Sequence, residues 1–97
     1  MLHLIFQLST DTAVFHRIDR DDDVVFLENA VFKANKGSVM TEVLQEMLNN
    51  NVHLYVLNED LETRGITKSE LVSGVEVIDY SGFVALSEKN KTSCTWN

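Results

Sequence analysis

The chain has 97 residues, which is enough for one domain spanning residues 1–97 with a modest core. Its net charge of −7 argues against direct binding to nucleic acid or to an anionic membrane, because both need basic surfaces. No apolar run approaches the roughly 20 residues of a membrane-spanning helix, and the chain starts without the basic segment of a signal peptide. A single cysteine, Cys94, excludes an internal disulfide and favours a reducing compartment. We therefore expect a cytoplasmic globular protein.

Four short apolar runs predict β-strands, at residues 2–8, 24–27, 52–57 and 75–78. The third run is apolar apart from His53, which is typical of a strand that is buried on both faces of a parallel sheet. The fourth run is interrupted by Glu76, which suggests a position near the sheet edge. We expect the first and third strands to be central.

Helical segments separate these runs. Residues 9–11 offer an N-cap for a short helix that ends near residue 18. Ser38 is expected to cap the clearest helix, whose apolar residues form one stripe: Val39, Met40, Val43, Leu44, Met47 and Leu48. Asn58 can N-cap the next helix, and Gly65 is expected to end it in the left-handed conformation.

The last third of the chain carries two further capping signals and a tail. Thr67 and Glu70 form the pattern of a capping box, and Asp79 can cap a last helix. That helix is expected to turn inward at Phe83, Val84 and Leu86. A polar tail begins at about residue 89 and carries Trp96. Trp96 either folds back over the domain or anchors on another subunit, since tryptophan is enriched at interface hot spots.

Alternation of strands and helices predicts an α/β fold with a mostly parallel sheet of four to five strands. Right-handed crossovers then place helices on both faces, which makes three layers. The carboxyl ends of parallel strands meet at one edge, where sites and partner surfaces usually lie. The candidate residues at this edge are Asn58, Glu59, Asp60, Arg64, Asp79 and Tyr80.

The sequence lacks the residue patterns that nucleotide-binding, phospho-acceptor and metal sites require. No glycine-rich turn follows the first strand, so a dinucleotide or Walker-type phosphate site is not expected. The acidic run at residues 19–23 precedes the second strand, which argues against a phospho-acceptor receiver, and we expect this run to be a solvated turn. His3, His16 and His53 do not fall at a metal-ligand spacing, so we expect structural histidines, no metal and no cofactor.

Cys94 is the only thiol, so it is the one candidate for a thiol nucleophile. It is a weak candidate for the following reason. A reactive cysteine needs a helix N-terminus or a cationic neighbour that lowers its pKa. Cys94 lies in the expected tail, with Lys89 and Lys91 nearby in the sequence. A tail offers little preorganisation, so we expect no catalytic residue in this chain.

Two segments resemble the TusB/DsrH family of sulfur relay subunits. The Leu-Asn-Glu-Asp-Leu sequence at residues 57–61, followed by Arg64-Gly65-Ile66, is similar to a segment of that family. Residues 78–84 with Leu86 resemble the Asp-Tyr…Phe-Val…Leu segment that follows. The opening residues 1–3 and the near-terminal Trp96 match as well. Residues 28–31 resemble the acidic-(Asp/Asn)-Gly-Val element, with Ala30 in place of the usual glycine.

This resemblance implies a DsrE-like fold and a subunit that works with TusC- and TusD-like (DsrF- and DsrE-like) partners. In that family the complex passes persulfide sulfur towards the 2-thiouridine of the tRNA wobble position. DsrH subunits of sulfur oxidisers can carry a cysteine on the first helix, but Val14 lies about where it would fall. The resemblance therefore implies a non-catalytic subunit. The alternatives are a sulfurtransferase that carries persulfide on Cys94, and a self-associating homologue outside the relay.

Overall fold

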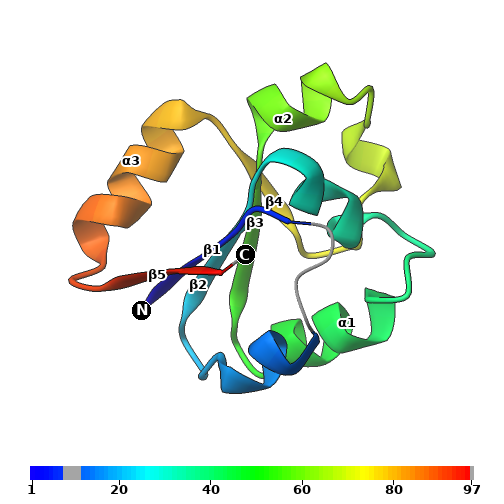
Figure 1. Ribbon diagram of the computed structural model, residues 1–97. Helices are drawn as coiled ribbons and strands as arrows, with labels where there is room; N and C mark the ends of the chain where they lie inside the picture. Colours follow the sequence, from blue (N-terminus) through cyan, green and yellow to red (C-terminus); the bar gives the residue numbers. More distant parts are fainter. Residues whose placement is uncertain (8–11, 97) are drawn as a thin grey trace.

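The computed structural model describes residues 1–7 and 12–96, so the end of the first predicted strand and the N-cap at residues 9–11 lie outside the described residues. Five strands form one parallel sheet in the order β4-β3-β2-β1-β5 (Figure 1). Their bounds are Leu2–Ile5 (β1), Asp23–Phe26 (β2), His53–Leu57 (β3), Glu76–Ile78 (β4) and Ser93–Trp96 (β5). The expected parallel α/β sheet is confirmed, but β2 lies at its centre, between β1 and β3.

The helices form two layers, one on each face of the sheet. The first three connections step from β1 to β4 in one direction, and their helices cover one face (Figure 1). These helices are η1 (Thr12–Arg17), η2 (Glu28–Ala34), α1 (Thr41–Asn49), α2 (Asn58–Thr63) and η3 (Lys68–Glu70), and the three η elements are 3-10 helices. The last connection runs back across the sheet from β4 to β5, and its helix α3 (Tyr80–Lys89) covers the other face.

Alternation along β2 divides the core between the two faces. Val24 and Phe26 are buried under the first helical layer, whereas Val25 between them is buried on the α3 side. The cluster under the first layer is the larger one and includes Leu44 and Met47 of α1. The α3 cluster has four buried members, Leu2, Val25, Leu27 and Leu86, and six that are only partly buried. The α3 face is therefore the thinly covered side of the molecule.

The expected polar tail from residue 89 is wrong, because its last part is a strand. Residues 93–96 form β5, which pairs with β1 in the register Leu2–Ser93 to Ile5–Trp96. Alternating apolar side chains, which are the usual signal of an edge strand, are limited here to Cys94 and Trp96. Two apolar positions are too few for periodicity to indicate a strand, so the pairing of β5 with β1 could not be predicted.

Two helices begin differently from the prediction. Ser38 caps a turn instead of the helix, α1 begins at Thr41, and Val39 is 97% exposed where a core position was expected. Asn58 is the first residue of α2, and its side chain donates to Glu62 instead of capping the helix. The N-cap positions are Met40 for α1 and Leu57 for α2, which lie two residues after and one residue before the positions that composition suggested.

Three other local signals are confirmed. Gly65 has a φ of 68° directly after α2, in the left-handed region where glycine is favoured. Thr67 and Glu70 form the capping box of η3. Asp79 caps α3, where its Oδ1 accepts a hydrogen bond from the backbone N–H of Gly82 at 2.8 Å.

Candidate functional site

The predicted edge at the carboxyl ends of the strands brings η2 and α2 together. The Asp60 carboxylate accepts a hydrogen bond from the backbone N–H of Glu28 at 2.8 Å. Arg64 forms an ion pair with Asp60 at 3.4 Å and donates from Nε to the side-chain oxygen of Asn29 at 3.0 Å. Glu28 has a φ of 51°, which is uncommon for a residue with a side chain. The Asp60–Arg64 pair therefore fixes an unusual turn after the central strand.

The same edge contains an open groove beside the start of α3. Asn58, Val77, Ile78, Asp79 and Gly82 line this groove, which has a volume of about 420 Å³. Asp79 is committed to its capping bond, so one of its oxygens is not free for a ligand. The structure thus brings Asn58 and Asp79 into one groove and places Asp60 and Arg64 in a separate hydrogen-bonded network.

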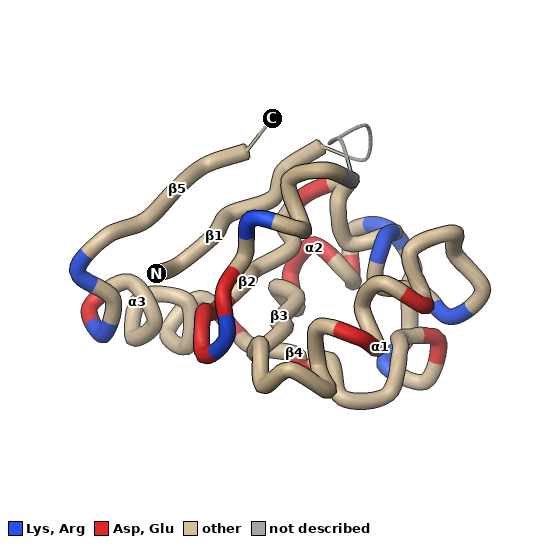
Figure 2. Tube along the Cα trace, turned by 90° about the horizontal axis from the view of Figure 1, so that it is seen from below, with Lys and Arg blue, Asp and Glu red and all other residues tan. Residues whose placement is uncertain are grey.

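The remaining predicted residues of this edge are exposed. The side chain of Tyr80 is 66% exposed and contacts the ring of Phe83, with 6.4 Å between the centroids. Glu59 is exposed on the first turn of α2. Acidic residues follow three neighbouring strands: Glu28 after β2, Glu59 and Asp60 after β3, and Asp79 after β4. Arg64 is the basic residue of the Asp60 network. Figure 2 shows acidic positions in red beside α2. The edge is an acidic surface.

Cys94 lies on β5 directly opposite His3 of β1. His3 is only 2% exposed, and both of its ring nitrogens have partners. Trp96 Nε1 lies 3.1 Å from Nδ1, and Asp22 Oδ2 lies 2.9 Å from Nε2. An indole N–H can only donate, so Nδ1 accepts and Nε2 carries the proton that is donated to Asp22. His3 therefore has no nitrogen left to act as a base for Cys94.

Trp96 folds back over the domain. Its indole is stacked on the His3 ring, with 6.3 Å between the centroids and an interplanar angle of 16°. It also packs against the larger core cluster. Trp96 therefore makes intramolecular contacts, and its role as an anchor on another subunit stays a prediction.

Asp22 and Asp23 are buried, so the prediction of a solvated turn is wrong for these two residues. Asp22 accepts from His3, from the N-terminal ammonium of Met1 at 3.0 Å and from the backbone N–H of Asp19 at 3.1 Å. Burial alone would raise the pKa of Asp22, but these hydrogen bonds outweigh it and hold the pKa below its ordinary value. Asp22 therefore links the chain start, β1 and the turn before β2.

Asp23 is 1% exposed and faces the end of α3. Its Oδ2 accepts from Lys89 Nζ at 3.3 Å and from Asn90 Nδ2 at 3.0 Å. Burial raises the pKa of the Tyr55 hydroxyl, and the charges of Asp23 and Glu76 raise it further. Asp23, Tyr55 and Lys89 thus lie near one another although they come from β2, β3 and the end of α3. No sequence pattern predicted this grouping.

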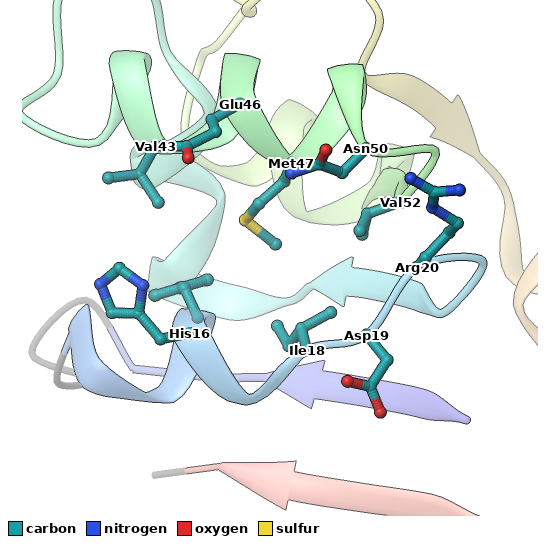
Figure 3. A pocket seen from close by; sticks show the side chains of 10 residues that line it. His16, Ile18, Asp19, Arg20, Val43, Glu46, Met47, Asn50 and Val52 are labelled. Carbon is teal, nitrogen blue, oxygen red and sulfur yellow. The ribbon is translucent and has the colours of Figure 1, made fainter.

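A second groove, of about 280 Å³, lies between α1 on one side and η1 with the segment that follows it on the other (Figure 3). Its floor is apolar, with Ile18, Met47 and Val52, and its rim carries the charged side chains of Arg20 and Glu46. The rim combines both signs of charge, so it does not select one class of ligand.

The described residues, 1–7 and 12–96, contain no group of three His, Cys, Asp or Glu side chains that could hold a metal ion. Within the same ranges, no helix is both long enough and apolar enough to cross a membrane.

Residues 6–93 match the family described as DsrH-like protein. The chain belongs to this family. A TusB protein of Buchnera aphidicola subsp. Baizongia pistaciae is 32% identical over 99 residues, which cover 99% of this chain and 100% of that protein. TusB of Serratia proteamaculans is 37% identical over 75 residues, 77% of this chain and 75% of that protein. These relatives confirm the family that the motifs around Asn58 and Asp79 indicated.

Two solved structures share the fold of this DsrH family member. A protein of unknown function from Methanobacterium thermoautotrophicum has a TM-score of 0.84 at 15% identity and covers 97% of this chain and 96% of its own. The ychN protein of E. coli has a TM-score of 0.78 at 14% identity and covers 97% of both chains. Both likenesses confirm the three-layer α/β fold.

Proposed function

We propose that this protein is the non-catalytic subunit of a TusBCD-type sulfur relay complex, which supports persulfide transfer for 2-thiolation of the tRNA wobble uridine. Its partners in this proposal are TusC- and TusD-like (DsrF- and DsrE-like) subunits in the cytoplasm. Membership of the DsrH-like family and similarity to TusB proteins support the assignment to a relay.

The observation that carries the non-catalytic role is the environment of Cys94. Persulfide transfer needs a thiolate, which an adjacent base or cation must stabilise. His3 lies opposite Cys94, but both ring nitrogens of His3 are engaged by Trp96 and Asp22. The sulfur-carrying thiol of the relay therefore belongs to a partner subunit in this proposal.

The charge of the chain supports a role without direct nucleic-acid contact. A net charge of −7 repels the phosphate backbone of tRNA. The edge where the strands end is acidic as well, with Glu28, Glu59 and Asp79 exposed. Any tRNA contact in the relay falls to other proteins.

Co-expression tests the assembly. The chain is produced with the TusC- and TusD-like proteins of the same organism, and the mixture is separated by size exclusion. We expect one stable complex that contains all three chains. Elution of this chain alone, either as a monomer or as a self-associated species, would contradict the proposal and would favour a homologue outside the relay.

A sulfurtransferase that uses Cys94 is the second candidate, because the register places a histidine directly opposite the thiol. In this mechanism the Cys94 thiolate takes the terminal sulfur of a donor persulfide and releases the donor as a thiolate. Mass spectrometry after incubation with a persulfide donor distinguishes the two candidates. A gain of one sulfur atom on Cys94, absent from Cys94→Ser, would support this second function.

A further inference from the structure

The apolar side chains on and under α3 form an incompletely covered surface, which we call the α3 patch. Its members are Phe6, Leu57, Ile78, Tyr80, Phe83 and Val84. Leu86 is the only buried residue of α3 in its ten positions, whereas Tyr80 is 66% and Val84 37% exposed. Tyr80, Phe83 and Val84 are spaced i, i+3 and i+4 and therefore lie on one side of the helix.

The patch carries no charge although the chain is strongly acidic. Residues 80–87 contain no charged side chain, and Figure 2 shows α3 free of charged positions except near its junction with β5. The opposite face of the sheet is covered by several helices, but α3 is the one helix that the described residues place on this face. Contiguous exposed apolar groups with a polar border are typical of protein interaction sites.

The border of the patch indicates what occupies it. Asn58 and Asp79 line the groove beside the start of α3, and the exposed Glu59 follows on the same edge. The other end of α3 carries Glu88 and Lys89, so the acidic border is confined to the edge with Glu59 and Asp79. Two copies of this chain would each bring this acidic edge and a net charge of −7 to the interface. Like charges that face each other across an interface disfavour association, whereas opposite charges favour it.

We propose that the α3 patch is the docking surface for a different protein subunit, which presents an apolar face bordered by lysine or arginine side chains. This inference rests on the proposed function, because a non-catalytic relay subunit acts through such a contact. Phe83 and Val84 supply the apolar centre. Glu59 is the exposed acidic residue that directly follows Asn58 of the neighbouring groove.

A pair of matched variants tests the surface. Val84→Asp places a charge in the centre of the patch, and Val39→Asp places the same charge at an exposed valine in the loop before α1. Binding of both to the co-expressed TusC- and TusD-like subunits is measured by calorimetry, after circular dichroism has confirmed that each variant is folded. We expect Val84→Asp to weaken binding by about 30-fold or more, as substitutions at interface hot spots do. Val39→Asp should bind as the wild type does.

A second pair tests the charge complementarity without altering the apolar centre. Glu59→Lys should slow association with the same subunits and reduce its dependence on salt, whereas Glu42→Lys on the exposed side of α1 should change neither. Tyr80→Ala serves where Val84→Asp fails to fold, because Tyr80 contributes mostly exposed surface.

The outcomes separate this inference from the proposed function. A wild-type complex that Val84→Asp and Tyr80→Ala leave intact would overturn the docking surface and leave the relay role standing. Self-association of the wild-type chain that Val84→Asp abolishes would overturn the choice of occupant. Absence of any complex with the wild-type chain would overturn both proposals.

Discussion

Asp22 illustrates how a single residue in a charged run can be buried. It accepts from the His3 ring, the Met1 ammonium and the Asp19 N–H, so its charge is paired within the fold. Neighbouring Asp21 stays exposed, with a φ of 70° and a hydrogen bond to Asn51. Composition alone predicts the same environment for both residues. The difference arises because β1 places His3 beside one carboxylate and not the other.

Replacement of Asp22 by Asn should destabilise the protein at neutral pH. The native pKa of Asp22 lies below its ordinary value of 3.8, so the stabilisation is complete above that value and is lost as the pH falls through the native pKa. We expect Asp22→Asn to lower the unfolding free energy by about 1–3 kcal/mol at pH 7, with a smaller difference below about pH 4. Urea unfolding at several pH values measures both effects.

Asp19→Asn is the matched control, because the side chain of Asp19 is exposed. It should lower the stability by less than about 0.5 kcal/mol, as is usual for surface substitutions. A deficit in Asp22→Asn that stays constant down to pH 3 would show that the carboxylate charge is not what stabilises this cluster.

Two residues of the type that caps helices differ in whether they cap one. Asp79 accepts from the N–H of Gly82 and caps α3, whereas Asn58 is already within α2 and contacts the exposed Glu62. Both residues have the composition of an N-cap. Only the position at which the strand ends and the helix begins distinguishes them, and that position depends on the packing of β3 and β4.

Alanine substitution at these two positions should give unequal results. Asp79→Ala removes a used cap and should lower the unfolding free energy by about 1 kcal/mol. Asn58→Ala removes one exposed side-chain bond and should lower it by a few tenths of a kcal/mol, about the value of an exposed pair one helical turn apart. Chemical denaturation of both variants under one condition makes the comparison. Equal losses would mean that Asn58 acts as the cap of α2.

Gly65, just after α2, allows the cost of a left-handed backbone conformation to be measured separately from side-chain packing. A Cβ at Gly65 would meet no atom within 4 Å, so its φ of 68° is the main obstacle to a side chain. Gly65→Ala should therefore lower the stability by about 1–2 kcal/mol, and Gly65→Asn by less, since asparagine tolerates this region. Thermal unfolding of the two variants would reveal the order. A greater loss in Gly65→Asn would point to a steric cause.

At the scale of the whole molecule, the parallel α/β sheet could be predicted because each of the first four strands is followed by a helical segment. The strand order could not, because β5 contains only two apolar side chains and pairs with β1 at the far end of the sequence. The candidate edge was predictable for the same topological reason. The cluster of His3, Asp22 and Trp96 was not, because long-range pairing of β1 with β5 creates it.

The proposed function depends on one assignment, that this chain supports the relay without carrying sulfur. Its most direct test is the 2-thiouridine content of tRNA in a strain that lacks the native chain and is complemented with Cys94→Ser. Cys94 is half-buried on an edge strand, so serine should leave the fold intact. We predict that the variant restores the same wobble 2-thiouridine as the wild-type chain. Thiolation that remains at the level of the uncomplemented strain, while the complex still assembles, would contradict the non-catalytic role.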